Sequence, residues 1–236
     1  MFTRAQDLLS GNGLAISELD GILLGVGPGS YTGLRVAASA VKGMLFGQEV
    51  PLYGVNTLAG FAAGMNEFTG EYTVHVIIDA RRTHVYTQSF RVGMSNASGD
   101  QSLKTESNSD LENKTKPTTN FGSNPKIVSV AKSGSVPGGN SGEFTKDNII
   151  LKSMIALSEP SLVEIDNIYD RFQDGDFLIG TGIQRLNPSK TTRLHLREID
   201  KTGAVGLIRI FDAGLNQFYK QIDVTDFEPT YTVQEN

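Results

Sequence analysis

The residues with the strongest claim to chemistry lie in one glycine-rich run, Gly25-Val26-Gly27-Pro28-Gly29-Ser30-Tyr31-Thr32-Gly33-Leu34-Arg35. Glycines give such a turn its backbone freedom, and Ser30 or Thr32 can cap the helix that comes next. Because a helix start exposes several N–H groups, Gly27, Gly29, Ser30 and Thr32 are candidates for an anion site. The run therefore predicts a strand-to-helix turn at which phosphate binding has to be considered.

The spacing of this run matches neither common phosphate-binding fingerprint. A P-loop ends in Gly-Lys-Ser or Gly-Lys-Thr, and this ending is absent here. The dinucleotide fingerprint is GxGxxG, whereas the run reads GxGxxxG, contains Pro28 and has no acidic residue at the end of the next strand. A tight turn that lets the strand and the helix pack closely is the preferred interpretation, and anion binding is the alternative.

Titratable and nucleophilic side chains do not group into a catalytic set. His75, His84 and His195 are scattered and form no HxxxH or HExxH pair, so no metal site is predicted. Cysteine is absent, which excludes disulfides, thiolate metal sites and cysteine nucleophiles. Ser30 lacks the glycine that a nucleophile elbow carries two residues later. The sequence predicts no catalytic residue and no cofactor held by this chain.

Two features at predicted strand ends admit a structural and a functional interpretation. Asp79 ends a strand, a position where acids act in sheet-based enzymes. Arg81 and Arg82 are close behind it, so an internal ion pair is preferred over a general base. Gly180-Thr181-Gly182 could lie against a nucleotide, although a single GxG is a weak signal.

Composition limits the class of protein and its partners. The chain has 236 residues and a formal net charge of -5, which argues against a stand-alone nucleic-acid binder, although a local basic patch could be hidden in the total. No apolar run has the length of about 18 residues that a membrane span needs, and the N-terminus lacks the apolar stretch of a signal peptide. A cytoplasmic protein without membrane contact is expected.

Hydrophobic patterning predicts the elements that carry these residues. Strands and helices alternate in the first part of the chain, which predicts an α/β layer. The segment 94–147 is rich in polar residues and glycine and nearly free of large apolar ones, which predicts a disordered insertion. The predicted elements are a helix over 3–10, a strand over 21–26, a helix over 31–47, a strand over 51–55, a helix capped by Thr57 and running to about Met65, strands over 73–79 and 83–92, a strand at 149–151, a helix capped by Ser158 with apolar residues through Phe172, a strand over 177–180 and a helix over 203–220.

The helix over 31–47 is apolar on an unusually wide arc of around 200°, against roughly 100° or more for a surface helix. One apolar sector can cover its own sheet. The other is made mainly of small residues and suits close approach by a second helix, which is either internal or part of another subunit. The candidate partner-interface residues in that sector are Gly33, Val36, Ala37, Ala40, Gly43 and Gly47.

Several of these motifs together resemble the TsaB family, also called YeaZ. They are the glycine run with Lys42-Gly43, then Pro51-Leu52-Tyr53-Gly54-Val55 with Thr57-Leu58, then Asp79-Ala80-Arg81 and the closing Glu228-Pro229-Thr230-Tyr231. The resemblance covers residues 5–92 well and 149–232 loosely. It implies the duplicated actin/Hsp70-like (ASKHA) fold of two lobes. The first lobe would comprise residues 1–68 together with the C-terminal helix 203–220, and the second lobe residues 72–200 with the insertion 94–147.

The resemblance also implies a function. A non-catalytic subunit of this kind pairs with a TsaD-like subunit, which holds ATP and metal and transfers threonylcarbamoyl to adenosine 37 of tRNA, and a TsaE-like ATPase joins the complex. Contact with tRNA would be indirect, and a homodimer is the alternative assembly of the lone chain. Alternative functions are a glycoprotease-like hydrolase and an actin-fold nucleotide-binding protein.

The chain departs from the family pattern in two places. Family members begin with a strand, an Asp-Thr-Ser stretch and a hairpin, a portion of roughly 40 residues that does not appear upstream of Arg4 in this sequence. Either the start is misassigned or the chain is a fragment. The first lobe is therefore expected to lack its N-terminal strands, which would leave the strand over 22–26 with an open edge. The second departure is the insertion over 94–147, where the family has a short connection.

Overall fold

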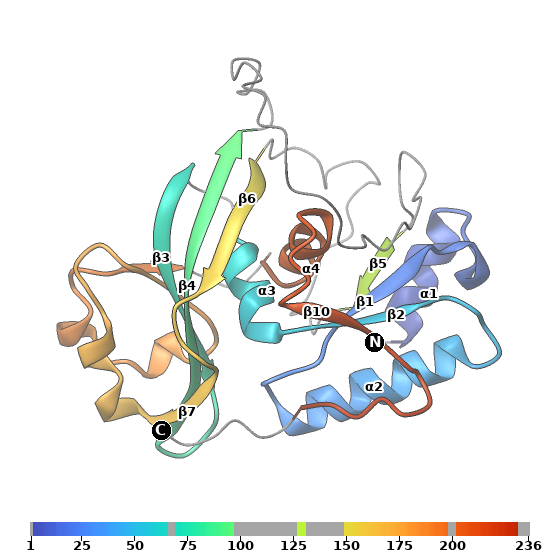
Figure 1. Cartoon of the computed structure of the whole chain (residues 1–236). Helices are drawn as coiled ribbons and strands as arrows, with labels where there is room; N and C mark the ends of the chain where they lie inside the picture. The colour runs from blue at the N-terminus through green and yellow to red at the C-terminus, as the bar shows by residue number, and fades with distance from the viewer. Residues whose placement is uncertain (1, 66–68, 97–126, 131–148, 198–201, 231–236) are drawn as a thin grey trace, which may run out of the picture.

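The computed structural model describes residues 2–65, 69–96, 127–130, 149–197 and 202–230. Two β-sheets lie on either side of a pair of short helices (Figure 1). The strand order is β10-β2-β1-β5 in the first sheet and β6-β4-β3-β8-β9 in the second, where β7 also pairs with β4. None of the described helices has the length and apolar character that crossing a membrane requires.

The first sheet is built on β1, whose central leucines are fully buried. β1 pairs in parallel with β2 on one side and with β5 on the other, while β10 runs antiparallel to β2. The expectation of an open edge at β1 is therefore wrong, because a strand from the polar segment pairs with it. The strands are β1 (Gly21–Gly25), β2 (Leu52–Val55), β5 (Ile127–Val130) and β10 (Tyr219–Ile222).

Helices α1 (Phe2–Gly11) and α2 (Tyr31–Leu45) lie together on one face of this sheet (Figure 1). Leu9 and Ala5 of α1 join the buried side of α2 and one face of the sheet in a single hydrophobic cluster. The apolar residues of α2 recur at helical spacing, and the residues after β1 make the turn into α2. The sequence pattern predicts α2 to within two residues at its end.

The second face of the first sheet is covered by α3 (Thr57–Ala63) and α4 (Thr202–Asp212), which separate the two sheets. The two helices approach closely at Gly60 and Gly206. A Cβ placed on Gly206 would lie 1.8 Å from the carbonyl oxygen of Gly60. Arg209 Nη1 donates hydrogen bonds to the carbonyl oxygens of Ala63 and Met65, which satisfies the end of α3.

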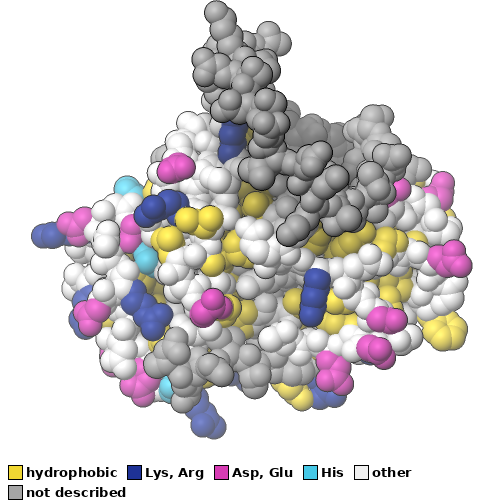
Figure 2. Space-filling view, in the orientation of Figure 1, with side chains coloured by type: hydrophobic (Ala, Val, Ile, Leu, Met, Phe, Trp, Pro, Cys, Tyr) yellow, Lys and Arg dark blue, Asp and Glu magenta, His cyan; other side chains and the backbone are white. Residues whose placement is uncertain are grey.

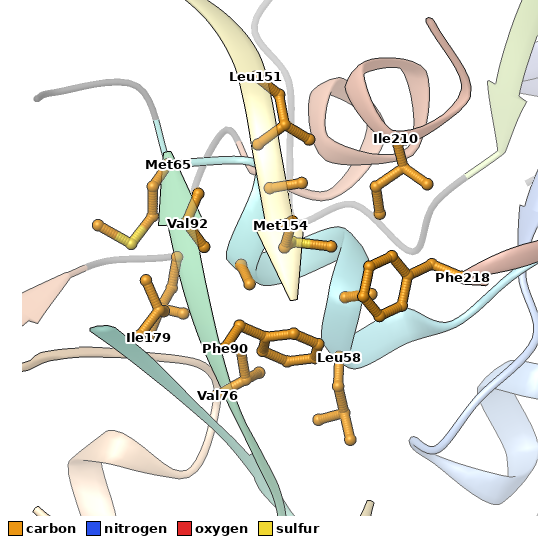
Figure 3. Close-up of a cluster of buried hydrophobic side chains, with 14 of the residues drawn as sticks. Leu58, Met65, Val76, Phe90, Val92, Leu151, Met154, Ile179, Ile210 and Phe218 are labelled. Atoms are coloured by element: carbon orange, nitrogen blue, oxygen red, sulfur yellow. The ribbon is translucent and has the colours of Figure 1, made fainter. Parts of the chain in front are cut away.

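The main core lies between the sheets. Figure 3 shows side chains from α3, β4, β6 and α4 converging with that of Phe218, just before β10. Phe90 and Phe218 meet edge to face with their ring centroids 5.8 Å apart. Because residues from both ends of the chain supply this cluster, it joins the two sheets into one packed body.

The second sheet is formed around the long antiparallel pair β3 and β4. Its outer face is covered by short turns from residues 165–190, which carry Ile168 and Leu186 into a third buried cluster. Its strands are β3 (Gly70–Asp79), β4 (His84–Asn96), β6 (Ile149–Ala156), β7 (Ser161–Glu164), β8 (Phe177–Ile179) and β9 (His195–Arg197).

Two predicted helices differ from the structure. The segment after Ser158 forms β7 and two 3-10 turns, since the His84–Thr87 part of β4 takes β7 as its hydrogen-bonding neighbour. The helix predicted over 203–220 ends at Asp212. Gly214 has φ +65°, and the N–H groups of Gly214 and Leu215 donate to Phe211 and Ile210, a glycine stop that frees β10 to join the first sheet.

The polar segment predicted as a disordered insertion is described only in part. Met94, Ser95 and Asn96 belong to β4, and residues 127–130 form β5, so ordered strands occur where the prediction has none. Residues 97–126 and 131–148 lie outside the described residues.

Candidate functional site

The glycine run forms a turn that is bonded to the start of α3. The N–H of Gly27 donates to Thr57 Oγ1 and the N–H of Thr57 donates to the carbonyl oxygen of Gly27, both over 2.9 Å. Thr57 therefore serves the turn, and its predicted role as the cap of α3 is wrong. Asn56 is the cap, since its Oδ1 accepts from the N–H groups of Leu58 and Ala59.

The four candidate anion-site residues lie along this turn, and part of its hydrogen-bonding capacity is used internally. Gly27 is buried, with φ +120° and a cis peptide to Pro28. Ser30 caps α2, because its Oγ accepts from the N–H of Gly33 over 3.4 Å. Gly29 is half-buried with open space beside it, and Thr32 is exposed on the first turn of α2. The geometry is that of a strand-to-helix connection.

The side of α2 that faces away from the first sheet is exposed and carries apolar and small residues. Val36 is 52% exposed, Gly43 and Gly47 have nothing within 4 Å of a Cβ built on them, and Phe46, the residue after the helix, is 88% exposed. Figure 2 shows hydrophobic side chains at the surface along its lower right edge, where α2 lies in Figure 1. The face therefore combines small residues with exposed apolar ones.

The six candidate interface residues are not all on that face. Val36, Gly43 and Gly47 are exposed, and Gly33 and Ala40 are half-buried beside them. Ala37 lies in the core with Leu34, Val41 and Leu45, on the opposite side of the helix. The exposed face is defined as Gly33, Val36, Ala40 and Gly43 of α2 with Phe46 and Gly47, which follow its last residue; docking through it is proposed below, and it is called the docking face from here on.

Asp79 makes an ion pair, but its partner is not one of the adjacent arginines. Its Oδ1 bonds to Nη1 of Arg185 and accepts the backbone N–H of Arg81 over 2.7 Å. Arg185 also donates to the carbonyl oxygens of Arg82 and His84. Arg81 and Arg82, in the turn between β3 and β4, both have positive φ, which is uncommon for residues other than glycine. Arg185 holds this turn in place, and the sequence does not single Arg185 out.

The Gly180-Thr181-Gly182 stretch packs against β3. A Cβ on Gly180 would lie 1.9 Å from the carbonyl oxygen of Ile77, and Gly180 has φ +134°. Thr181 Oγ1 accepts the backbone N–H of Asp79 over 3.0 Å. Close strand packing explains why these positions are glycine, and a nucleotide is not needed to explain them.

A buried polar network that the sequence does not predict surrounds His75. Its Nδ1 lies 2.7 Å from Ser89 Oγ, and its Nε2 lies 2.8 Å from Asp176 Oδ2. Asp176 also accepts the N–H of Gln173, and the ring of Phe172 packs 5.0 Å from the imidazole. His75 is only 4% exposed, and both of its ring nitrogens have a partner, as buried polar groups require. Because His75, Ser89 and Asp176 come from β3, β4 and the loop before β8, the network links these three segments.

A cleft of about 550 Å³ opens beside the glycine turn. It lies where the turn, the start of β10 and the β6–β7 connection come together. Within the described part of the chain, no group of three or more His, Asp or Glu side chains is placed to hold a metal. The residues that line the cleft are Val26, Gly27, Pro28, Asn56, Glu159, Pro160, Asn216, Gln217, Phe218, Tyr219, Lys220 and Thr230.

Known structures share this architecture. YeaZ from Pseudomonas aeruginosa superposes with a TM-score of 0.56 at 19% identity, covering 97% of this chain and 81% of that one. A second P. aeruginosa structure, described as an uncharacterized protein with similarity to peptidase YeaZ, gives a TM-score of 0.57 over 96% and 80% of the two chains. The predicted α/β, actin-like fold is confirmed.

Sequence comparisons extend the relationship. The TsaB protein of Escherichia coli K12, a tRNA threonylcarbamoyladenosine biosynthesis protein, is 37% identical over 81 residues, which are 34% of this chain and 35% of that protein. The TsaB protein of Bacillus subtilis 168 is 36% identical over 80 residues, 34% of each chain. The matched stretch thus spans about a third of the length of these relatives.

A family model matches a longer stretch of the sequence than these two relatives do. The model described as TsaD, tRNA N6-adenosine threonylcarbamoyltransferase, matches residues 3–149, which is more than half of the chain. The resemblance to TsaB (YeaZ) proteins that the glycine run predicts is also confirmed. The chain therefore belongs to the family of TsaD, tRNA N6-adenosine threonylcarbamoyltransferase, and its similar relatives include the TsaB proteins of threonylcarbamoyladenosine biosynthesis.

Proposed function

We propose that this chain is an accessory subunit of tRNA threonylcarbamoyladenosine biosynthesis that docks on a TsaD-like subunit through the exposed face of α2. The observation that carries the proposal is the docking face itself, a surface of glycines and alanine beside Val36 and Phe46. In this proposal the chain does no chemistry. The TsaD-like subunit supplies ATP, metal and the transfer step.

The composition of the docking face suits a helix of a second subunit. Ala40 and Gly43 lie one turn apart in α2, so their small size lets two helix backbones approach closely and pack ridge into groove. Val36 and Phe46 then supply apolar surface, and each such side chain stabilises the complex by about 1.5–3 kcal/mol when it is fully covered. Close approach and apolar anchors together favour a protein partner at this face.

The names of the relatives support the pathway, and the chain's charge agrees with an indirect role. TsaB proteins are named for threonylcarbamoyladenosine biosynthesis, and the matched family model is named for the transferase. A formal net charge of -5 disfavours tight binding of tRNA by this chain alone. We therefore propose that tRNA is held mainly by the partner, and that a TsaE-like ATPase joins the assembled pair.

The test is a pair of substitutions on the docking face. Ala40→Arg and Gly43→Leu should each weaken binding of a purified TsaD-like subunit by at least about 100-fold, because a long side chain blocks close helix approach. Binding is measured by calorimetry, and the fold by circular dichroism and melting temperature. Ala156→Arg, at an exposed position near the end of β6, introduces the same side chain on the other sheet and should bind like the parent. Normal binding by folded Ala40→Arg and Gly43→Leu variants would overturn the proposal.

A second function is favoured by one specific feature, the cleft beside the glycine turn. Its volume of about 550 Å³ falls in the range of small-ligand sites, and Lys220 in its lining supplies one positive charge for an anionic ligand such as a nucleotide. A nucleotide-binding role would raise the melting temperature in proportion to the logarithm of ATP concentration. No shift at millimolar ATP with magnesium would leave the docking role as the single proposal.

A further inference from the structure

The segment Asp223–Thr230 follows β10 and contains the Glu228-Pro229-Thr230 motif, to which the proposed docking role assigns no part. It leaves β10 through a turn in which Asp223 Oδ1 accepts hydrogen bonds from the N–H and the Oγ1 of Thr225, over 2.8 and 2.7 Å. Figure 1 shows it crossing back along α2, as the last part of the red ribbon. The segment therefore runs beside the helix that carries the docking face.

Three contacts attach this segment to α2 and to the glycine turn. In the last turn of α2, Lys42 Nζ donates to the carbonyl oxygen of Thr225 over 3.1 Å. In the middle, the ring of Phe227 is 7% exposed and lies in the hydrophobic cluster of α1, α2 and the first sheet. At the other end, the N–H of Thr230 donates to the carbonyl oxygen of Val26 over 2.9 Å.

The same segment explains why position 27 is a glycine. A Cβ at Gly27 would lie 2.3 Å from the carbonyl oxygen of Thr230, so the tail occupies the space that any other residue would need. Backbone oxygen cannot move away as a flexible side chain can. The glycine turn at the start of α2 and the last described residues of the chain are thus fitted to each other.

We infer that Asp223–Thr230 is a strap that positions α2 for docking, and that Phe227 is a positioning residue for the partner although it lies on the buried side of the helix. The strap holds α2 near both of its ends and wedges one aromatic ring under it. This inference rests on the proposed docking role of α2. It adds that partner affinity is set partly by residues that never touch the partner.

The expected effect depends on the fraction of molecules in which α2 is correctly placed. The affinity that is measured equals the intrinsic affinity multiplied by that fraction. If removing the ring leaves α2 in place in about one molecule in ten, the Kd for the partner rises about tenfold. Exchange of α2 amide hydrogens with solvent should accelerate by much more than tenfold, since exchange follows the ratio of displaced to placed molecules and that ratio is far below one in the parent.

The experiment compares four variants of the full chain. Phe227→Ala removes the ring, and Phe227→Leu keeps an apolar side chain as the conservative rescue. Thr230→Pro removes the N–H that bonds to Val26, and its matched control Thr230→Ala keeps that N–H. For each variant, the Kd for a purified TsaD-like subunit and the hydrogen exchange of α2 are measured, with the amides of β3 as the internal reference. Phe227→Ala and Thr230→Pro should raise the Kd about tenfold and accelerate α2 exchange by a larger factor, and the two controls should restore most of the parental values.

The outcomes separate the strap from the docking role. If Gly43→Leu abolishes binding while Phe227→Ala and Thr230→Pro change neither the Kd nor α2 exchange, the strap is overturned and the docking role stands. If both strap variants accelerate α2 exchange without changing the Kd, positioning for docking is overturned, because the partner then does not depend on α2. If β3 exchange accelerates equally, Phe227 stabilises the whole fold and the positioning role fails.

Discussion

At the scale of single residues, Tyr72 combines burial with an unsatisfied polar group. Its hydroxyl is buried and has no hydrogen-bond partner within the described part of the chain. Burial raises the pKa of Tyr72 to about 12, and the charge of Arg209 lowers it by a smaller amount. Leaving a buried hydroxyl unpaired costs about 1–3 kcal/mol.

Tyr72→Phe should therefore stabilise the chain by about 1 kcal/mol near pH 7, since it removes the unpaired hydroxyl and keeps the ring. The pH dependence has a definite sign. The unfolded chain releases the Tyr72 proton near pH 10, before the folded chain does, so the free energy of unfolding falls between about pH 10 and pH 12. Urea unfolding at pH 7 and across this alkaline range measures both effects. A parent curve as flat as that of Tyr72→Phe above pH 10 would contradict the assignment.

Single residues also show how far sequence reasoning reaches into the candidate site. Asp79 is recognisable as an ion-pairing acid, because a carboxylate beside two arginines is a local pattern. Its true partner, Arg185, lies 106 positions away, and the His75 network joins residues 101 positions apart. No local pattern identifies such partners, since they meet only after the turns of residues 165–190 have packed on the second sheet.

At the scale of elements, the contact between α3 and α4 rests on two facing glycines. Gly206 has no room for a Cβ, which would lie 1.8 Å from the carbonyl oxygen of Gly60. Gly43 of α2 has open space around it. Both are inside helices, where alanine is favoured over glycine by about 1 kcal/mol. The space around each glycine therefore decides whether its replacement by alanine raises or lowers the free energy of unfolding.

Gly206→Ala should destabilise the chain by about 2–4 kcal/mol, because the backbones of α3 and α4 must separate and open the core between the sheets. Gly43→Ala, the matched change on an open helix face, should stabilise it by up to about 1 kcal/mol. Denaturant unfolding of the two variants beside the parent measures both values. Equal stability of the two variants would show that the contact at Gly60 is not tight.

Element prediction succeeds where a local pattern and the tertiary environment agree. The strand β1 and the helix α2 carry apolar residues at the spacing of their own geometry. The segment after Ser158 shows the opposite case, because its apolar residues recur at helical spacing while the unpaired edge of β4 makes β7 the better solution. The end of α4 has a local signal in Gly214, but the apolar residues beyond it extend the predicted helix through position 220.

At the scale of the whole molecule, the docking face is an exposed apolar surface whenever no partner covers it. We expect the isolated chain to form a homodimer through this face at high concentration, since two copies of one helix face can pack on each other about a two-fold axis. Phe46→Ser should weaken this dimer by about 10–100-fold, because it deletes a ring that is 88% exposed in the single chain. Sedimentation velocity over a concentration series measures the dimer constant.

Addition of the TsaD-like subunit provides the control for this dimer. If both partners use the same face, the homodimer should dissociate as the heterodimer forms. A homodimer that persists alongside the heterodimer, or that ignores Phe46→Ser, would place self-association on another surface.

The sequence by itself determined the α/β class, the glycine turn, the wide apolar arc of α2 and the family, because each depends on short runs of residues that are close together in the chain. Tertiary structure alone decided that β5 covers the edge of β1, that Ala37 lies in the core, and that the tail holds α2, where Lys42 and Thr225 are 183 positions apart. The physical reason is range. Helix and turn preferences act over a few residues, whereas the partners of a buried group are chosen by how the packed elements fill space and satisfy one another's hydrogen bonds.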